Sequence, residues 1–378
     1  MKIVIAPDSF KGSLTAHEAT TAMSNGVLSV LSNVKIEEIP LADGGDGTMD
    51  SLVFSTGGQI KDVLVLDPLG REIIAQYGIL GDRKTAVIEL ATASGLILLK
   101  KNELNPLITT TYGTGQLILQ ALDDGFRSFI ICIGGSATND CGAGMAQAIG
   151  LKFLNTNNVE ILGKMCGDLL GNINFIDSSN IHPGLKESRI LVACDVNNPL
   201  LGQHGCAHIY APQKGASPKM IEKLESNMKS FIKIAENKYD ISVRDVPGAG
   251  AAGGLGAGLM LFLKAELKSG IDIVLKACDF QKRIKNADLI ITGEGKIDDQ
   301  TIQGKTISGI VRYAKLQKIP IIAFAGVIEN GDNIKNLGIS NIFSISSNDL
   351  PVEKSIANAS TLLQNKVESV IRKYYNKI

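Results

Sequence analysis

The stretch MKIVIAPDSFKGSLTAHEATTAMSNGVLSVL, residues 1–31, sets the fold class. Its residues 3–6 form a continuous apolar run, which is typical of a strand buried on both faces of a sheet. Thr15 and Glu18 have the spacing of a capping box, which predicts a helix that begins there and runs towards Leu31. A strand, a polar loop and a helix in this order are the opening of an α/β unit.

The same order of elements returns at the other end of the chain. Further strands are predicted at 35–41, 287–292, 319–325 and 342–345, and further helices at 48–55, 306–316 and 352–375. The middle differs, because the predicted strands 63–66, 73–80 and 85–90 follow one another closely enough to pair without helical crossovers. Alternating helices and Gly-rich turns come after them.

We therefore expect a doubly wound, Rossmann-like α/β domain built from residues 1–62 and 287–378, with a second α/β domain, residues 63–286, inserted between its halves. A length of 378 residues also predicts two domains, since single cores usually stop growing at ~250–300 residues. Ligands often bind at domain junctions, so the active site is expected in the cleft between the two domains.

Composition excludes several classes of protein. Hydrophobic residues make up 44% of the chain and charged residues 20%, which argues against extensive disorder. The 38 basic residues balance 38 acidic ones, so no global charge attracts nucleic acid or an anionic membrane. The six cysteines lack metal-binding spacing, and no apolar run has the length of a membrane span or of a signal-peptide core. We expect a cytoplasmic protein with reduced thiols.

Five loops rich in Gly, Asp or hydroxyl side chains follow predicted strands or precede predicted helices. In the first, Asp8, Ser9 and Lys11 lie just after the first strand, where ligands bind in open α/β sheets. A plain capping turn explains this segment about equally well. In the second loop, ADGGDGT, the carboxylates Asp43 and Asp46 stand between glycines that let backbone amides approach a ligand. That density of Gly and Asp favours a functional loop over a flexible turn.

The other three loops have similar alternatives. TTTYGTG at 109–115 precedes a predicted helix and offers amides and hydroxyls to an anion, although N-capping explains much of it. GGSATNDCGAG at 134–144 directly follows the predicted strand 129–133, as a phosphate-binding loop would. Asp195 follows the predicted strand 190–193 and is a candidate general base or metal ligand, while an Asx-turn before Pro199 is about as plausible.

Two motif matches fail for lack of context. Residues 248–253 read G-x-G-x-x-G, but the preceding segment is a poor parallel strand, so close helix packing explains these glycines better than a dinucleotide site. Gly304-Lys305-Thr306 resembles the end of a Walker A loop, yet Asp299 stands where its first glycine belongs. The remaining chemistry is that of Asp, Lys, hydroxyls and backbone amides, which are the groups used in phosphoryl transfer.

The loops also form an ordered set of motifs. In chain order they are APDSFKGSL, PLADGGDGT, TTTYGTGQLI, IGGSATNDCGAGM, CDVNNPLLG, APQKGAS, PGAGAAGGLGAGL and ITGEGKIDDQ. This set resembles the type 1 glycerate kinase family from Met1 to beyond Gly326. The resemblance implies ATP and Mg²⁺ as cofactors, D-glycerate as substrate, a phosphoglycerate as product, and a Rossmann-like domain with an inserted second domain. The sequence does not separate 2-phosphoglycerate from 3-phosphoglycerate and leaves the oligomeric state open, a homodimer included.

On this reading, a carboxylate activates a glycerate hydroxyl for in-line transfer. Asp195 is the first candidate for the base; Asp43 and Asp46 come next, and all three are candidate Mg²⁺ ligands. Lys11 is expected to neutralise phosphate charge. Candidate substrate-binding residues are Asp8, Ser9, Arg71, Asn197 and Asn198. Arg71 is the candidate for binding the glycerate carboxylate, although it follows a predicted turn and a purely structural role there is equally plausible. Candidate nucleotide- and phosphate-binding residues are Gly113, Thr114, Gly115, Gly134, Gly135, Ser136, Asn139, Glu294, Lys296 and Asp298.

Three positions depart from the family pattern. Leu104 and Lys296 stand where arginine is usual, and Cys141 stands where glycine is usual. If those arginines bind an oxyanion through two parallel hydrogen bonds, Lys296 keeps the positive charge but cannot form the paired hydrogen bonds. Leu104 provides neither the charge nor the hydrogen bonds.

Two other classes of function compete with a kinase. A sensor of sugar acids or nucleotides could keep this fold without turnover, but it would not need the intact charged residues at 8, 11, 43, 46 and 195. A nicotinamide-dependent oxidoreductase would depend on the glycines at 248–253 alone.

Overall fold

The computed structural model of the protein describes residues 1–298, 306–329, 338–346 and 351–375. Contacts divide the chain into two compact units. Unit 1 comprises residues 1–43, 50–57 and 271–378, and unit 2 comprises residues 44–49 and 58–270. The sequence had placed the divisions at 62/63 and 286/287. Two residues of the Walker-like segment, Gly304 and Lys305, and its nearby Asp299 lie outside the described ranges.

Unit 1 is built on a five-stranded sheet in which all neighbours are parallel, in the order β13-β12-β11-β1-β2. The first strand is buried as expected, since Ile3, Val4 and Ile5 are fully inaccessible. It pairs with β11 on one side and β2 on the other, with Ile3 opposite Leu289 and Ile36. The strands are β1 Lys2–Ile5, β2 Lys35–Glu38, β11 Leu289–Ile297, β12 Ile321–Ile328 and β13 Asn341–Ser344.

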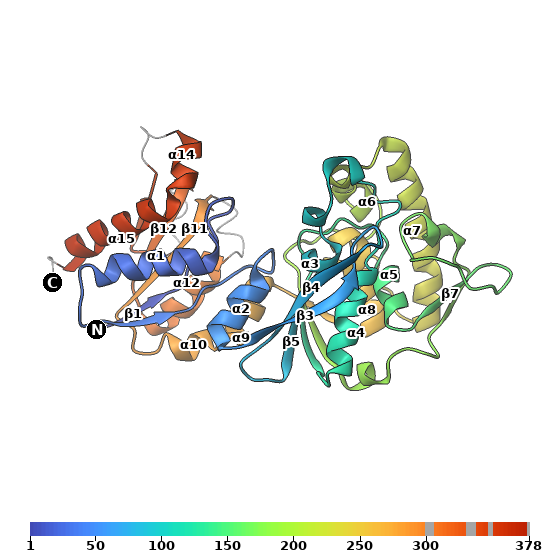
Figure 1. The fold of residues 1–378 in the computed structure, drawn as a ribbon, viewed down its shortest axis with the longest axis horizontal. Coiled ribbons are helices and arrows are strands. Elements are labelled where there is room, and N and C mark those ends of the chain that lie inside the picture. The colour runs from blue at the N-terminus through green and yellow to red at the C-terminus, as the bar shows by residue number, and fades with distance from the viewer. Residues whose placement is uncertain (299–305, 330–337, 347–350, 376–378) are drawn as a thin grey trace. The chain divides into compact units, whose positions relative to one another are not determined.

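Helices α1 (Ala16–Leu28) and α15 (Ala359–Tyr375) pack together against one face of this sheet (Figure 1). The capping box at the start of α1 is confirmed, with Thr15 N–H donating to Glu18 Oε2 over 2.8 Å and Glu18 N–H to Thr15 Oγ1 over 3.2 Å. The single helix predicted at 352–375 is wrong, because the chain leaves helical geometry at Asn358 and forms two helices. The other helices of this part are α9 Gly270–Ala277, α10 Phe280–Arg283, α12 Thr306–Gln317 and α14 Val352–Ala357.

Unit 2 is built on a six-stranded mixed sheet in the order β10-β9-β6-β5-β4-β3. The three closely spaced strands of the sequence are confirmed: β3 pairs antiparallel with β4, and β4 with β5. From β5 onward the pairs β5–β6, β6–β9 and β9–β10 are parallel. The strands are β3 Gln59–Leu66, β4 Glu72–Ile79, β5 Thr85–Glu89, β6 Ser128–Cys132, β9 Arg189–Ala193 and β10 Glu266–Lys268.

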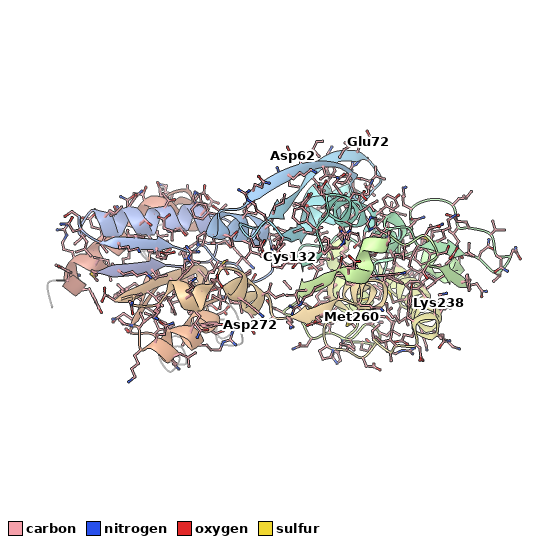
Figure 2. The ribbon with its side chains drawn as sticks, turned by 90° about the horizontal axis from the view of Figure 1, so that it is seen from below. Asp62, Glu72, Cys132, Lys238, Met260 and Asp272 are labelled. Atoms are coloured by element: carbon pink, nitrogen blue, oxygen red, sulfur yellow. The ribbon has the colours of Figure 1, made fainter. Side chains whose placement is uncertain are left out.

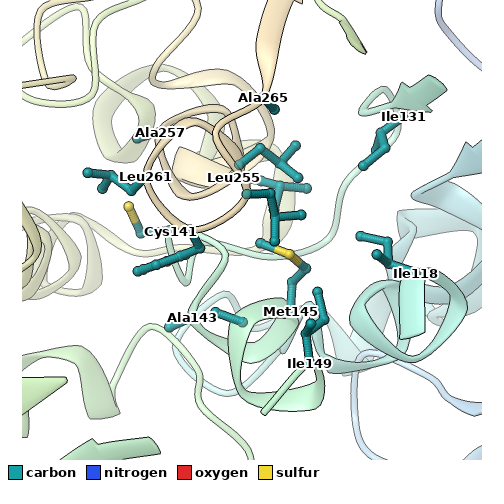
Figure 3. Close-up of a cluster of buried hydrophobic side chains, with 14 of the residues drawn as sticks. Ile118, Ile131, Cys141, Ala143, Met145, Ile149, Leu255, Ala257, Leu261 and Ala265 are labelled. Atoms are coloured by element: carbon teal, nitrogen blue, oxygen red, sulfur yellow. The ribbon is translucent and has the colours of Figure 1, made fainter. Parts of the chain in front are cut away.

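Helices bury one large apolar core in unit 2. Ile118 of α4, Met145 of α5 and Leu255 of α8 meet Ile131 of β6 in this cluster (Figure 3). Cys132 of β6 is fully buried in unit 2, whereas Asp62 of β3 lies on the exposed hairpin of β3 and β4 (Figure 2). The remaining elements are α2 Thr48–Thr56, which joins the two units, α3 Ala91–Ser94, α4 Tyr112–Asp123, α5 Ala143–Ala148, β7 Lys152–Leu154, β8 Phe175–Asp177, α6 Cys206–Tyr210, α7 Pro218–Tyr239 and α8 Ala251–Leu263.

The Gly-rich start of α8 allows close packing, as the sequence predicted. A Cβ on Gly256 would lie 2.2 Å from the carbonyl oxygen of Gly248, and one on Gly258 would lie 2.3 Å from that of Cys141. No strand precedes these glycines, so the context of a dinucleotide-binding loop is missing in this described part of the chain. No described helix is long and apolar enough to cross a membrane.

Candidate active site

Acidic side chains gather where the parallel strands of unit 1 end. Asp8 follows β1, Asp43 follows β2, and Glu294 lies within β11, the strand on the other side of β1. Backbone pairing continues beyond the strands, with Asp8 N–H donating to Gly293 O over 2.8 Å and Leu41 N–H to Pro7 O over 2.9 Å. This arrangement places the carboxylates at one edge of the sheet, where open α/β sheets bind ligands.

Asp8 has an unusual electrostatic environment. Its side chain is buried, Ser9 N–H donates to its Oδ1 over 2.6 Å, and the Thr306 hydroxyl donates to its Oδ2. Burial and the nearby charge of Asp43 raise the pKa of Asp8 to about 6, although the two hydrogen bonds act in the opposite direction. A carboxyl group with so perturbed a pKa at a sheet edge is a functional-site candidate.

Two lysines accompany these carboxylates. Lys11 is exposed in the loop after β1, and its backbone passes close to Gly295 of β11, where a Cβ would lie 2.9 Å from Lys11 N. Lys296 forms ion pairs with Glu329, 2.8 Å away, and with Asp298, 3.4 Å away. Its ammonium is therefore shared with two carboxylates, and an arriving phosphate would compete with them.

In unit 2, residues 44–49 lie against the carboxyl ends of the parallel strands. A Cβ on Gly44 would lie 2.8 Å from Ala193 Cβ at the end of β9, and one on Gly134, after β6, would lie 3.1 Å from Gly45 Cα. The carboxylate of Asp46 is next to Gly135, at 2.8 Å from an added Cβ. The structure thus brings Asp46 to the loop that follows β6.

Asp195 lies at the same edge of the unit 2 sheet, after β9. It is exposed, and its Oδ1 accepts a hydrogen bond of 2.9 Å from the backbone N–H of Gly270, which follows β10. Asn197 is exposed beside it, whereas the Asn198 amide donates to His204 O over 2.9 Å and accepts from the Tyr210 hydroxyl over 2.6 Å. The Asn198 side chain therefore stabilises the segment between β9 and α6.

Arg71 and the glycines after Tyr112 make internal contacts. Arg71 is paired with Asp67 over 2.5 Å and with Glu103 over 2.7 Å, the arrangement expected if it serves the turn after β3. Gly113 and Gly115 are buried where α4 meets Leu66 O and Met145 O, and the Thr114 hydroxyl donates to Ser94 Oγ over 2.8 Å. Close packing of α4, which begins at Tyr112, accounts for these small residues.

Sequence reasoning missed three buried charged residues beside these loops. Glu89, at the end of β5, accepts hydrogen bonds from Gly47 N–H over 2.8 Å and Met49 N–H over 3.1 Å, and so fixes the Asp46 loop. Asp140 accepts from the backbone of Thr111, Gly142 and Gly144 and from the Thr111 hydroxyl, within the loop after β6. Lys214 bonds to that same loop. The sequence offered one indication for each: Glu89 stands at the end of a strand, Asp140 stands in a Gly-rich loop, and Lys214 belongs to the APQKGAS motif.

Cys141 and Leu104, two of the residues that depart from the family pattern, both lie close to the loops described above. Cys141 adopts a left-handed conformation with φ 50°, which glycine adopts at less cost, and its side chain is fully buried. Leu104 lies beside Gly215, the residue after Lys214, where a Cβ would approach Leu104 O to 2.4 Å.

The carboxylates fit a hydrated divalent cation. Among the described residues, no group of three or more His, Cys, Asp or Glu side chains could hold a metal ion by itself. Mg²⁺ usually binds through one or two carboxylates together with substrate phosphates and water, so a site completed by nucleotide needs no such group. A cation would relieve the repulsion between Asp8 and Asp43.

A separate cavity of about 690 Å³ lies in unit 1, at the amino ends of its strands. It is lined by residues of α9, α10, the loop that follows α10, and α12, among them Phe280 and Tyr313. No predicted site residue lines it. The candidate active site is therefore defined by the loops at the carboxyl ends of the strands.

An α/β fold with carboxylates, lysines and Gly-rich loops at the carboxyl ends of parallel strands is typical of enzymes that act on phosphorylated small molecules. The chain belongs to the glycerate kinase family, whose sequence profile matches residues 3–375. Its relatives include the glycerate kinase of Bacillus subtilis (strain 168), 46% identical over 371 residues that cover 98% of this chain and 97% of that protein.

Two further matches agree. The glycerate 2-kinase of Escherichia coli (strain K12) is 47% identical over 346 residues, which cover 91% of this chain and 90% of that protein. A crystal structure assigned as glycerate kinase 2 from Salmonella typhimurium LT2 has a TM-score of 0.90 and 41% identity, and covers 100% of this chain and 99% of its own. The family resemblance read from the motifs is confirmed at the level of the family.

Proposed function

We propose that the protein is an ATP-dependent glycerate kinase of type 1, which transfers the γ-phosphoryl of ATP to a hydroxyl of D-glycerate. The products are ADP and 2-phosphoglycerate or 3-phosphoglycerate. The observation that carries this proposal is near full-length similarity to glycerate kinases at 46–47% identity, joined to carboxylates and Gly-rich loops at the ends of parallel strands.

The carboxylates divide between a base and a cation site. Asp195 is the candidate base, because it is exposed and its Oδ1 is oriented by Gly270 N–H. During transfer the glycerate hydroxyl oxygen forms a bond to the γ-phosphorus, the bond from that phosphorus to the bridging oxygen of ADP breaks, and the hydroxyl proton passes to the carboxylate. When bound, Mg²⁺ neutralises phosphate charge, and Asp43 and Asp46 are the candidates to hold it.

Several finer assignments belong to the same proposal. The five-stranded parallel sheet of unit 1, in which β1 has β2 on one side and β11 on the other, supports a doubly wound, Rossmann-like domain. All six cysteines are free and five of them are buried, which supports a reducing, cytoplasmic location. The positions of Lys11 and Lys296, close in the chain to Asp8 and Glu294, support a role for both lysines in neutralising phosphate charge.

Turnover with defined acceptors tests the proposal. Purified protein incubated with MgATP and D-glycerate should release ADP, and phosphorus NMR of the mixture assigns the phosphorylated hydroxyl. Glycerol is the matched control, since it keeps the hydroxyls but lacks the carboxylate. Equal turnover with glycerol, or no ADP release with D-glycerate, would reject the substrate assignment.

A further inference from the structure

Lys214 is a buried lysine that holds the loop after β6. It ends the short 3₁₀ turn Pro212–Lys214 and is 1% exposed. Its Nζ donates to Ser136 Oγ over 2.7 Å and to Thr138 O over 2.6 Å. A residue more than seventy positions away in the sequence thus joins two points of the loop that carries Gly134, Gly135 and Asn139.

The positive charge of Lys214 is not matched by an ion pair among the described residues, since both of its acceptors are neutral oxygens. Burial lowers the pKa of Lys214 to about 8, while Cys206 of α6 and Asp140 of the same loop act in the opposite direction. The Asp140 carboxylate is occupied by Thr111, Gly142 and Gly144. A buried ammonium without a direct ion pair is costly, and a fold that needed only packing here would use an apolar side chain.

The loop held by Lys214 contains further unsatisfied polar groups. Both side-chain atoms of Asn139, its Oδ1 and Nδ2, and the hydroxyl of Thr138 are buried without a hydrogen-bond partner in the described part of the chain. Buried polar atoms are rarely left unpaired in a purely structural segment. Three such atoms beside a buried ammonium that lacks a direct ion pair indicate that the loop is completed by a ligand.

We propose that Lys214 is a positioning residue for phosphoryl transfer: its ammonium fixes the Ser136–Thr138 segment, and thereby the loop after β6, in the shape that receives the nucleotide phosphates. Lys214 acts through the loop and does not touch the transferred group. Its ammonium has no direct ion pair, so it also favours an anion near the loop, because Coulomb attraction is strong where water is excluded. The proposal rests on the proposed function and adds to it the group that shapes the nucleotide site.

The test compares Lys214→Met, which removes the charge and nearly keeps the volume, with Lys214→Arg, which keeps a charge at every working pH. Lys219→Met, in the exposed first turn of α7, is the matched control. We expect Lys214→Met to lower kcat/KM for ATP by about 10–100-fold, the usual effect of losing hydrogen bonds to a charged group, and to change KM for D-glycerate by less than about twofold. Lys219→Met should behave as the wild type.

The pH profile separates positioning from packing. In the wild type, kcat/KM for ATP should fall as the pH rises through about 8, because Lys214 loses its charge there. Lys214→Met should lack this alkaline fall, and Lys214→Arg should shift it above the measured range. A flat wild-type profile, normal kcat/KM for ATP in Lys214→Met, or a loss confined to KM for D-glycerate would each overturn the proposal.

The measurements distinguish failure of the proposed function from failure of the role of Lys214. If Lys214→Met does not fold, as judged by near-ultraviolet circular dichroism, the profiles of the wild type and of Lys214→Arg decide. If the wild type does not phosphorylate D-glycerate at all, the proposed function fails; if it does so with a flat alkaline profile, only the role of Lys214 fails.

Discussion

Asp43 helps to raise the pKa of Asp8 across the ends of two neighbouring strands. Asp8 follows β1 and Asp43 follows β2, and the parallel pairing of these strands brings both carboxyl groups to one edge of the sheet. Burial raises the pKa of Asp8 most, and the charge of Asp43 adds to it, so that the value reaches about 6. A carboxyl group whose pKa is raised in this way, beside a second carboxylate, is a candidate for a functional site.

Replacing Asp8 by Asn should stabilise the protein at neutral pH while lowering turnover. The native state holds the Asp8 proton up to a pKa of about 6, whereas the usual value is 3.8, so wild-type stability falls as the pH rises through this window. Asn has no charge to bury, so the variant does not lose this free energy of unfolding, which amounts to at most about 3 kcal/mol.

Urea unfolding at pH 4 and pH 7 measures this difference. The free energy of unfolding of Asp8→Asn relative to wild type should increase between the two pH values, and that of the exposed control Asp50→Asn in α2 should not. The same relative stability of Asp8→Asn at both pH values would contradict the prediction.

Replacing Glu89 by Gln should loosen the loop that carries Asp46. One carboxylate oxygen accepts from Gly47 N–H and the other from Met49 N–H, and a Gln amide can accept only one of these bonds while its NH₂ faces the other donor. We expect turnover to fall by about tenfold or more, the usual effect of losing one buried hydrogen bond to a charged group.

Hydrogen exchange provides an independent readout for Glu89→Gln, because the amides of Gly47 and Met49 should exchange faster than in the wild type. Glu72→Gln on the exposed hairpin is the control for the change of charge (Figure 2). Unchanged protection of both amides would show that Glu89 does not hold this loop.

Replacing Asp195 by Asn should remove the candidate base while keeping its loop. The Asn oxygen can still accept the hydrogen bond from Gly270 N–H, so the melting temperature should change little. Turnover should fall by about 10²–10⁴-fold, the range for loss of a general base. Asp245→Asn, at an exposed position in the same unit, is the matched control. Near-normal turnover would transfer the role to Asp43 or Asp46.

Removing divalent cations should abolish turnover without unfolding the protein. The described residues include no cluster of three metal-binding side chains that would make the fold depend on a bound ion. Activity should vanish in EDTA and return when Mg²⁺ is added in excess, with the far-ultraviolet circular dichroism unchanged throughout. Loss of helical signal in EDTA would instead indicate a structural metal.

Local sequence was sufficient for most of the helices and strands and for the positions of the Gly- and Asp-rich loops between them. The apolar run at 3–6, the capping box of Thr15 and Glu18, and the closely spaced strands of the middle region all appear where they were predicted. The reason is that strand burial, helix capping and hairpin pairing depend on residues a few positions apart. The break at Asn358 was missed, since neither Gly nor Pro marks it.

Tertiary structure alone decided which distant side chains meet. Glu89 reaches the loop of Asp46 from 40 positions or more away, and Lys214 reaches the loop after β6 from 76 or more. The same is true of the perturbed pKa of Asp8, which comes from burial and from Asp43 on another strand. Burial and charge act through space, and the free energy that places a buried lysine or glutamate against a loop is set by groups that no local pattern relates to it.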